Sequence, residues 1–231
     1  MEVLSEQYLA DLEQYRGCLP NTVKAYGRDL QSFMTFLKGS GTGFAMDLRH
    51  VKSSDVQAFA HSLRGRSANT IRRAVHALSS FFGWAQRLGY TSANPAMGVQ
   101  LPKKPPRLPK CPSEEECRAL LAVAWTPRER VAIHLLLTTG LRKSELLALD
   151  LSDFRPDLSE VFVRGKGGKE RLIPVPEQTR EVLHAYLAER GHESGPVLPN
   201  RDGRPMTSTT LQRLFTRVLK RAGLQDKGYS I

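Results

Sequence analysis

The chain has 231 residues, of which 40% are hydrophobic and 25% charged, a composition typical of a soluble globular protein with one large or two ordinary domains. It contains no apolar run near the roughly 20 residues needed to cross a bilayer, and its acid-rich N-terminal stretch is unlike a signal peptide. We therefore expect a cytoplasmic protein with no membrane partner. None of its three cysteines forms a CxxC pair, so no metal site is predicted.

Positive charge is spread unevenly along the chain. Residues 1–98 contain 11 Lys and Arg against 7 Asp and Glu, and residues 113–231 contain 19 against 16. The 14 residues between them, 99–112, contain 4 bases and no acid, a net charge of +4. Neutralising phosphates releases counterions, which makes nucleic acid the natural partner, although a basic and merely soluble protein would have the same total charge.

Apolar residues at three- and four-residue spacing predict four helices within residues 1–98. The first covers about residues 2–15, and the second is capped by Asn21 or Thr22 and runs to about Leu37. The third runs from Ser54 to about Leu63, and the fourth is a long helix that starts at Ser67. The long helix has the widest apolar face. We therefore predict an all-helical first domain.

The entrance of the long helix is strongly basic. Four arginines fall within residues 64–73, where the helix N-terminus itself favours anions, and two hydroxyl side chains add neutral donors. On the second helix, two basic side chains fall away from the apolar stripe. A solvated basic helix end is the alternative for any single arginine. The DNA contacts predicted in this domain are Lys24, Arg28, Arg64, Arg66, Ser67, Thr70, Arg72 and Arg73.

The segment 99–112 is predicted to connect two domains. Its prolines exclude a helix and make it extended and semi-rigid. Three of its bases, Lys103, Lys104 and Arg107, are further predicted DNA contacts, because an extended basic strap suits a protein that wraps a duplex. A stiff linker between any two domains would have the same character.

Residues 113–231 predict a mainly α domain with one small antiparallel sheet. Capping boxes begin helices at Ser113 and Thr126. The second of these helices is apolar on most sides, so we expect it to be central, with His134 as a core histidine bonded to a neighbour. The remaining predicted elements are strands at Val161–Arg164 and Arg171–Val175, and helices at about Glu177–Glu189 and from Thr207 or Ser208 to about Ala222.

Two cations in this domain have unusual surroundings. Gly140 ends the central helix and Ser144 can cap the next, which holds Arg142 in a tight turn. The guanidinium of Arg142 is a planar fork that matches two phosphate oxygens. Lys166 lies in the glycine-rich turn between the strands, where a flexible ammonium could serve as the acid for a leaving hydroxyl. Taken singly, most surface arginines and hairpin lysines have no such role.

Two segments together resemble the tyrosine recombinase family of phage integrases and Xer-type recombinases. They are TTGLRKSELLALDLSDF and GKGGKERLIPVP, in which Lys166 follows Arg142 by 24 residues. NTVKAYGRDLQSFMTFL and SANTIRRAVHALSSFFGWA resemble the family's helical core-binding domain, and PAMGVQLPKKPPRLPK resembles its interdomain linker. The resemblance implies a core-binding, DNA-binding domain at 1–98, a basic Pro-rich linker at 99–112 and the N-terminal part of a catalytic domain at 113–231.

The resemblance also implies an activity: site-specific DNA cleavage and rejoining through a 3′-phosphotyrosyl intermediate, without a cofactor. Arg142 would be the first catalytic arginine, Lys166 the catalytic lysine and Glu145 a buried acid that supports them. Lys169 is the rival lysine, and Lys143 and Lys169 are predicted as DNA contacts. The implied partners are double-stranded DNA with an inverted-repeat recombination site, held in a C-shaped clamp, and other protomers in a tetrameric synapse when the protein is full length.

The family pattern continues, after the segment like GYSI, with a His-x-x-Arg box, a later His or Trp and the nucleophilic tyrosine. None of these follows Tyr229 in the 231 residues, and Tyr229 itself stands where the family approaches the His-x-x-Arg box. We therefore expect the chain to bind DNA as a fragment without cleaving it. A non-enzymatic DNA-binding protein derived from this fold is the alternative, and a generic helical interaction protein would make the contexts of Arg142 and Lys166 coincidental.

Overall fold

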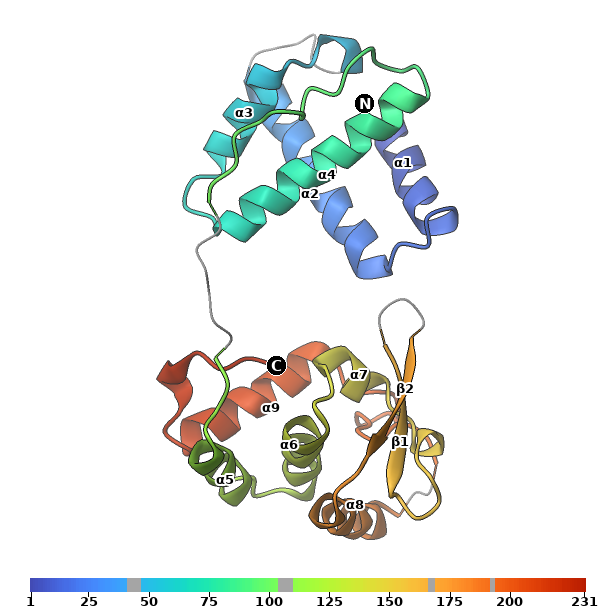
Figure 1. Ribbon diagram of the computed structural model, residues 1–231, viewed down its shortest axis with the longest axis vertical. Helices are drawn as coiled ribbons and strands as arrows, with labels where there is room; N and C mark the ends of the chain where they lie inside the picture. Colours follow the sequence, from blue (N-terminus) through green and yellow to red (C-terminus); the bar gives the residue numbers. More distant parts are fainter. Residues whose placement is uncertain (41–46, 104–109, 166–168, 192–193) are drawn as a thin grey trace. The chain divides into compact units, whose positions relative to one another are not determined.

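The computed structural model describes residues 1–40, 47–103, 110–165, 169–191 and 194–231. These residues belong to two compact units, Met1–Arg107 (unit 1) and Leu108–Ile231 (unit 2), and each unit has a hydrophobic core of its own (Figure 1). Unit 1 is helical where it is described, and unit 2 adds a two-stranded antiparallel sheet to its helices. The predicted fold, mainly α with a small antiparallel sheet in the second domain, is confirmed.

Unit 1 is built around its two long helices. Its α-helices are α1 (Glu2–Gln14), α2 (Pro20–Gly39), α3 (Ser53–Ser62) and α4 (Ala68–Arg87). α2 packs against the other three, and aromatic rings fill the space between them. Phe33 of α2 and Phe82 of α4 meet edge to face with ring centroids 6.3 Å apart, and Tyr8 of α1 meets Phe81 of α4 at 5.4 Å. These contacts bury the apolar face predicted for α4.

The start of α2 differs from the prediction. We expected Asn21 or Thr22 to cap this helix, but the structure places the N-cap at Leu19 and the first helical residue at Pro20. Proline is well suited to the first position of a helix, because the amide hydrogen that it lacks would have no partner there. By contrast, the predicted start of α4 at Ser67 is confirmed: Ser67 is its N-cap, and its hydroxyl accepts a hydrogen bond from the Thr70 amide at 3.2 Å.

The first residues of the predicted connector lie against unit 1. Gln100 donates its amide to the Gln57 side chain at 2.9 Å, and Arg72 donates to the Pro102 carbonyl at 3.3 Å. Val99 and Leu101 pack on the edge of the core. Residues 99–102, the start of the predicted connector, are therefore fastened to α3 and α4.

Unit 2 is arranged around one central helix. Its elements are α5 (Glu114–Ala122), α6 (Pro127–Thr139), α7 (Lys143–Ala148), β1 (Glu160–Arg164), β2 (Glu170–Pro174), α8 (Glu177–Arg190) and α9 (Ser208–Arg221). α6 contacts α5, α7, α8 and α9, so its predicted central position is confirmed (Figure 1). Of the helices in the described residues, none is long and apolar enough to span a bilayer.

One detail of α6 differs from the prediction. The Nδ1 atom of His134 is buried and has no hydrogen-bond partner among the described residues, so the expected neighbour is not found for that atom. Burial lowers the pKa of His134 below its ordinary value, since a charged imidazolium is disfavoured away from water.

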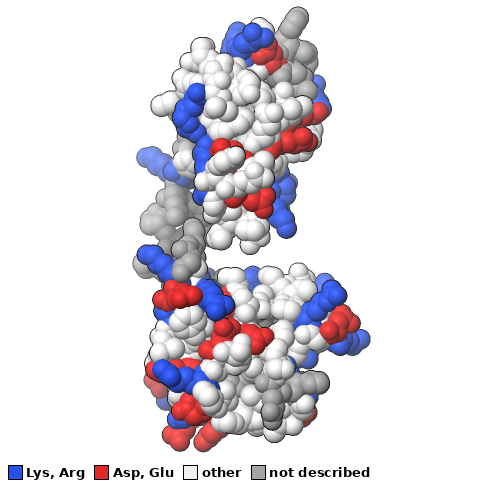
Figure 2. Space-filling view, turned by 90° about the vertical axis from the view of Figure 1, so that its right-hand side faces the viewer, with Lys and Arg blue, Asp and Glu red and all other residues white. Residues whose placement is uncertain are grey.

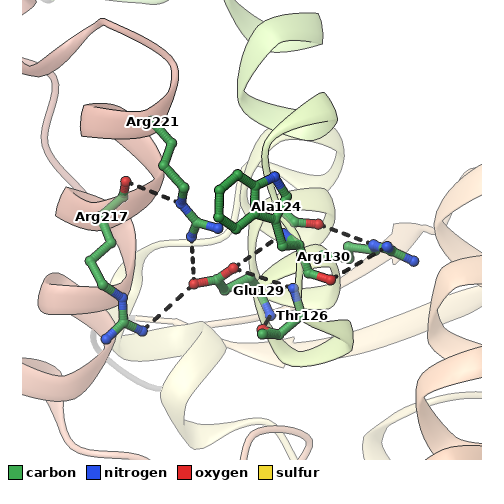
Figure 3. A network of polar contacts seen from close by, with 7 residues as sticks. Ala124, Thr126, Glu129, Arg130, Arg217 and Arg221 are labelled. Carbon is green, nitrogen blue, oxygen red and sulfur yellow. Dashed lines mark hydrogen bonds and ion pairs between the residues drawn. The ribbon is translucent and has the colours of Figure 1, made fainter.

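α9 is fastened to the start of α6 by a buried carboxylate. Glu129 is 4% exposed, and its oxygens accept hydrogen bonds from the Arg221 guanidinium at 2.6 Å and from the amides of Trp125 and Thr126 at 3.2 and 3.3 Å (Figure 3). Arg217 approaches the same carboxylate at 3.6 Å. Two arginines one turn apart on α9 thus converge on one carboxylate at the N-terminus of α6, which sets how the two helices meet.

Candidate phosphate site and nucleic-acid surfaces

Arg142 lies in the turn between α6 and α7. Gly140 ends α6 in the left-handed conformation, with φ of 61°, and Leu141 is buried in the core. Arg142 is the N-cap of α7, which begins one residue before the Ser144 that we expected to cap it. Because the backbone on both sides is held, the base of the Arg142 side chain is fixed, while the side chain itself remains 70% exposed.

The carboxylate of Glu145 is the centre of the arrangement around Arg142. This side chain is 4% exposed and accepts four hydrogen bonds. Two come from Arg142, from its amide and its Nη1 atom, both at 2.9 Å. The other two come from Nη1 and Nη2 of Arg171, on β2, at 3.1 and 2.8 Å. The sequence predicted Glu145 as the supporting acid and did not predict Arg171.

These hydrogen bonds keep Glu145 ionised. The Arg171 hydrogen bonds, which outweigh the opposing effect of burial, together with those from Arg142, lower the pKa of Glu145 to about 2. The pKa of Arg171 is raised, chiefly by its hydrogen bonds to Glu145. Glu145 is therefore a fixed negative charge, and two arginines on different elements share it.

Gly165, which follows β1, lies next to this cluster. Its amide donates to the carbonyl of Lys169, which precedes β2, at 2.7 Å. A Cβ atom at Gly165 would stand 3.3 Å from Nη1 of Arg171 and 3.6 Å from Glu145, so the close approach favours glycine here. Lys169 is exposed. Lys166, the predicted catalytic lysine, lies outside the described residues.

α9 approaches α7, the helix that follows the Arg142 turn, at Gln212. Lys143, a predicted DNA contact, lies 3.4 Å from the Gln212 side chain of α9, and α9 packs against α7. The solvent-facing side of α9 carries Arg213, Arg217 and Lys220, all exposed. We did not assign these residues from the sequence, although their three- to four-residue spacing opposite the apolar stripe could have indicated a basic helix face.

Acidic side chains accompany these bases. Figure 2 shows Lys and Arg interspersed with Asp and Glu on the drawn face of unit 2. Ion pairs of unit 2 include the exposed pair of Arg118 with Glu114 and the partly exposed pair of Arg155 with Glu160. The position of each cation therefore says more about a DNA surface than the total charge does.

In unit 1, the predicted contacts at the start of α4 divide into two groups. Arg64 and Arg66 are exposed on the turn that leads into the helix, and no ion pair is found for either in the described residues. Ser67 and Thr70 share a hydroxyl hydrogen bond of 2.8 Å and serve as the helix cap. Anion binding at this helix start would therefore fall mainly to the two arginines and the backbone amides.

The other two arginines of α4 have protein partners. Arg72 is bonded to the connector, and Arg73 donates to the buried Asp29 of α2 at 2.9 Å. Burial raises the pKa of Asp29, and the charges of Arg73 and Arg28 oppose that effect. The Arg73–Asp29 pair joins α2 to α4. Arg28, which precedes Asp29, and Lys24 are both exposed on α2.

The predicted contacts of the connector are described only in part. Lys103 is exposed at the end of the segment that is fastened to unit 1. Lys104 and Arg107 lie outside the described residues.

Tyr229 is bound within unit 2. Its hydroxyl donates to Glu116 of α5 at 2.6 Å, and Lys227 approaches the same carboxylate at 3.3 Å. The hydrogen bond to Glu116 raises the pKa of Tyr229 to about 12, and the same contact is the main cause that lowers the pKa of Glu116 to about 2. A tyrosine held in this way is a poor nucleophile at neutral pH.

The chemistry available here is that of anion binding. Arg142 presents a guanidinium whose Nε and Nη2 atoms have no hydrogen-bond partner in the described part of the chain, and Lys143 follows it at the start of α7. Such a fork can hold the non-bridging oxygens of a phosphodiester. No cluster of three His, Cys, Asp or Glu that could hold a metal ion occurs in the ranges the structure describes.

Both units match known protein families. Residues 113–229 match the phage integrase family, and residues 5–89 match the phage integrase N-terminal SAM-like domain. Tyrosine recombinase XerD of Halalkalibacterium halodurans is 30% identical over 234 residues, which cover 95% of this chain and 77% of the relative. Tyrosine recombinase XerC of Lacticaseibacillus casei is 32% identical with the same coverage of each chain.

Solved structures agree with the sequence matches. Lambda integrase, in a dimer bound to a COC′ core site, has a TM-score of 0.77 at 19% identity, covering 97% of this chain and 82% of that one. XerH recombinase, bound to a palindromic difH substrate in a post-cleavage complex, has a TM-score of 0.72 at 21% identity, covering 95% and 68%. These likenesses show the fold. With the family matches over both units, they establish that this chain belongs to the phage integrase family of tyrosine recombinases.

Proposed function

We propose that this protein acts in site-specific DNA recombination, and that its 231 residues bind duplex DNA and hold a phosphodiester group at Arg142. One observation carries the proposal: a single guanidinium nitrogen of Arg142 donates to the ionised Glu145, while the side chain is 70% exposed on a turn whose backbone is held. A preorganised guanidinium of this kind stabilises charge that develops on phosphate oxygens during strand cleavage.

The two units would divide the task. We assign DNA binding to residues 1–98, through Lys24, Arg28, Arg64 and Arg66 with the amides at the start of α4, and the phosphate site to residues 113–231. Residues 99–112 are assigned as the linker. The relatives are tyrosine recombinases, and lambda integrase and XerH were solved on DNA, which supports duplex DNA as the partner.

Each proposed active-site residue has a distinct role. Arg142 would bind the scissile phosphate, Glu145 would orient Arg142, and Lys166 would protonate the leaving hydroxyl as a cation close to the phosphate. Strand cleavage by a tyrosine would conserve the phosphodiester energy in a 3′-phosphotyrosyl bond, so rejoining would need no nucleotide or metal. Inverted-repeat DNA and a tetramer of protomers are the partners proposed for the full-length protein, in keeping with the lambda integrase tetramer on a Holliday junction.

We propose further that the 231 residues bind DNA without cutting it. The two tyrosine hydroxyls of unit 2 do not suit nucleophilic attack: Tyr186 is buried, and Tyr229 is bonded to Glu116 with its pKa raised to about 12. The arrangement therefore supplies the phosphate-holding part of a cleavage site.

Two measurements with the 231-residue chain test the proposal. In a mobility-shift titration against heparin, the chain should retain a duplex, and the affinity should fall steeply as salt rises. Failure to bind any duplex in preference to heparin would refute DNA binding. With a nicked suicide duplex, no covalent adduct should form, and an adduct that maps to Tyr229 would show that the nucleophile assignment is wrong.

A further inference from the structure

Arg171 is the least expected member of the cluster around Arg142. It lies on β2, 26 residues after Glu145, and its two terminal nitrogens grip both oxygens of that carboxylate. The Arg171 side chain is 38% exposed and that of Arg142 is 70% exposed, so Arg171 is the more buried of the two arginines. The bidentate grip is the strongest geometry that an arginine and a carboxylate can form.

The four hydrogen bonds on Glu145 fill its acceptor capacity. A carboxylate offers about four lone-pair positions, two on each oxygen. Oε1 receives Nη1 of Arg142 and Nη1 of Arg171, and Oε2 receives the Arg142 amide and Nη2 of Arg171. No position is left for a second side-chain nitrogen of Arg142.

From this occupancy we infer that Arg171 is a positioning residue: by taking one position on each Glu145 oxygen, it restricts Arg142 to a single side-chain contact and so keeps the rest of the Arg142 guanidinium available for a DNA phosphate. Without Arg171, two acceptor positions of a buried carboxylate would be empty. Arg142 is the nearest cation already in contact, and it would turn its fork onto Glu145 and away from solvent, because an under-satisfied buried carboxylate is costly.

The backbone at Gly165 supports this role. Gly165 leaves room for Arg171, because a Cβ atom there would stand only 3.3 Å from Nη1 of Arg171, and the Gly165 amide is bonded across the hairpin to Lys169. Arg171 thereby connects β2 to the Arg142 turn through one shared charge. The inference rests on the proposed phosphate-binding function of Arg142, and it goes further by assigning a residue that makes that function possible.

The test compares variants of the 231-residue chain on one fluorescein-labelled duplex of mixed sequence, read by anisotropy. Arg171→Met should weaken binding on the order of tenfold, the size of one lost charge-assisted contact. Arg171→Lys should weaken it to a similar extent, because lysine retains the charge but lacks the fork. In an Arg142→Met background, Arg171→Met should weaken binding only slightly, by the factor expected for the loss of one charge, since its larger effect acts through Arg142.

Arg164→Met is the matched control. Arg164 lies on the same hairpin and pairs with Glu170 at 3.4 Å instead of with Glu145. Its loss removes one charge and should weaken binding slightly, by the same factor in the parent chain and in the Arg142→Met background. Additive weakening by Arg171→Met in the Arg142→Met background, or full affinity of Arg171→Lys, would overturn the inference in favour of direct contact or simple charge.

A second measurement decides the inference without DNA. Nitrogen NMR of the Arg142 guanidinium should report slower rotation about its Cζ–Nε bond in Arg171→Met than in the parent chain, because a bidentate grip by Glu145 hinders that rotation. Unchanged rotation would contradict the positioning role. If the parent chain fails to bind the duplex while the rotation slows as expected, the proposed function is wrong and the relation between Arg171 and Arg142 is upheld.

Discussion

Arg221 donates a hydrogen bond of 2.6 Å to the buried Glu129 across 92 residues of sequence. Its guanidinium also lies 4.5 Å from the centroid of the Trp125 ring, which is 67% exposed. The same arginine thus satisfies a buried carboxylate and is covered by an aromatic face on its other side. The contact ties the basic helix α9 to the central helix α6.

Replacing Glu129 with glutamine should destabilise unit 2. The change leaves Arg221 without its charged partner, and we expect a loss of about 2–4 kcal/mol in the free energy of unfolding, as for other buried pairs that lose one member. Glu114→Gln is the control: its pair with Arg118 is exposed, so the loss should stay within about 1 kcal/mol. Urea unfolding followed by circular dichroism measures both, and equal losses would contradict the assigned role of Glu129.

Glu145 should make unit 2 sensitive to acid. Its pKa is held at about 2, below its ordinary value of 4.5, chiefly by Arg171. The stabilisation is therefore fully present above pH 4.5 and is lost as the pH falls toward 2. Glu129, whose pKa is also lowered despite its burial, adds to the same trend.

The Glu145→Gln variant should lose less stability than the parent chain over that pH interval, because the ionisation that drives the loss is removed. The free energies of unfolding of the two proteins should differ most at neutral pH and become similar in acid. Urea midpoints measured at a series of pH values check this. Parallel curves for the two proteins would show that Glu145 does not titrate as assigned.

Arg66 and Arg73 should respond differently to neutralisation. Arg66 is exposed at the start of α4, so Arg66→Gln should weaken DNA binding and reduce the slope of log affinity against log salt by about 0.9, the value for one lost phosphate contact. Arg73 is paired with the buried Asp29, so Arg73→Gln should lower the stability of unit 1 more than it changes the slope. Anisotropy titrations at several salt concentrations, with melting curves, separate the two effects. Equal slope changes would contradict the assignment.

The two tryptophans should report the two units separately. Trp84 is 6% exposed in unit 1, and Trp125 lies in unit 2. In a Trp125→Phe background, Phe33→Ala should lower the stability seen by Trp84 fluorescence by about 3–5 kcal/mol, the usual cost of truncating a buried phenylalanine. In a Trp84→Phe background, the same change should leave the unfolding midpoint of unit 2 in place, because the two cores share no residue. A joint shift of both midpoints would show that the units unfold together.

The sequence by itself determined most of the local structure. Ser113 and Thr126 cap helices as predicted, and Ser67 caps the helix predicted to start there, because a hydroxyl before an apolar run satisfies an amide of its own first turn. Gly140 ends α6 and leaves Arg142 in a short rigid turn for equally local reasons. Even the local error at Pro20 follows from backbone chemistry close in sequence.

The tertiary structure alone decided which charges meet. Glu145 with Arg171, Glu129 with Arg221 and Asp29 with Arg73 are separated by 26, 92 and 44 residues. Helical and strand periods say which face of an element a side chain is on, but they do not say which face of another element lies opposite. Which faces meet is decided when the apolar stripes of the elements pack together. The packing therefore determines that Arg171 shares Glu145 with Arg142 and that Arg73 pairs with Asp29.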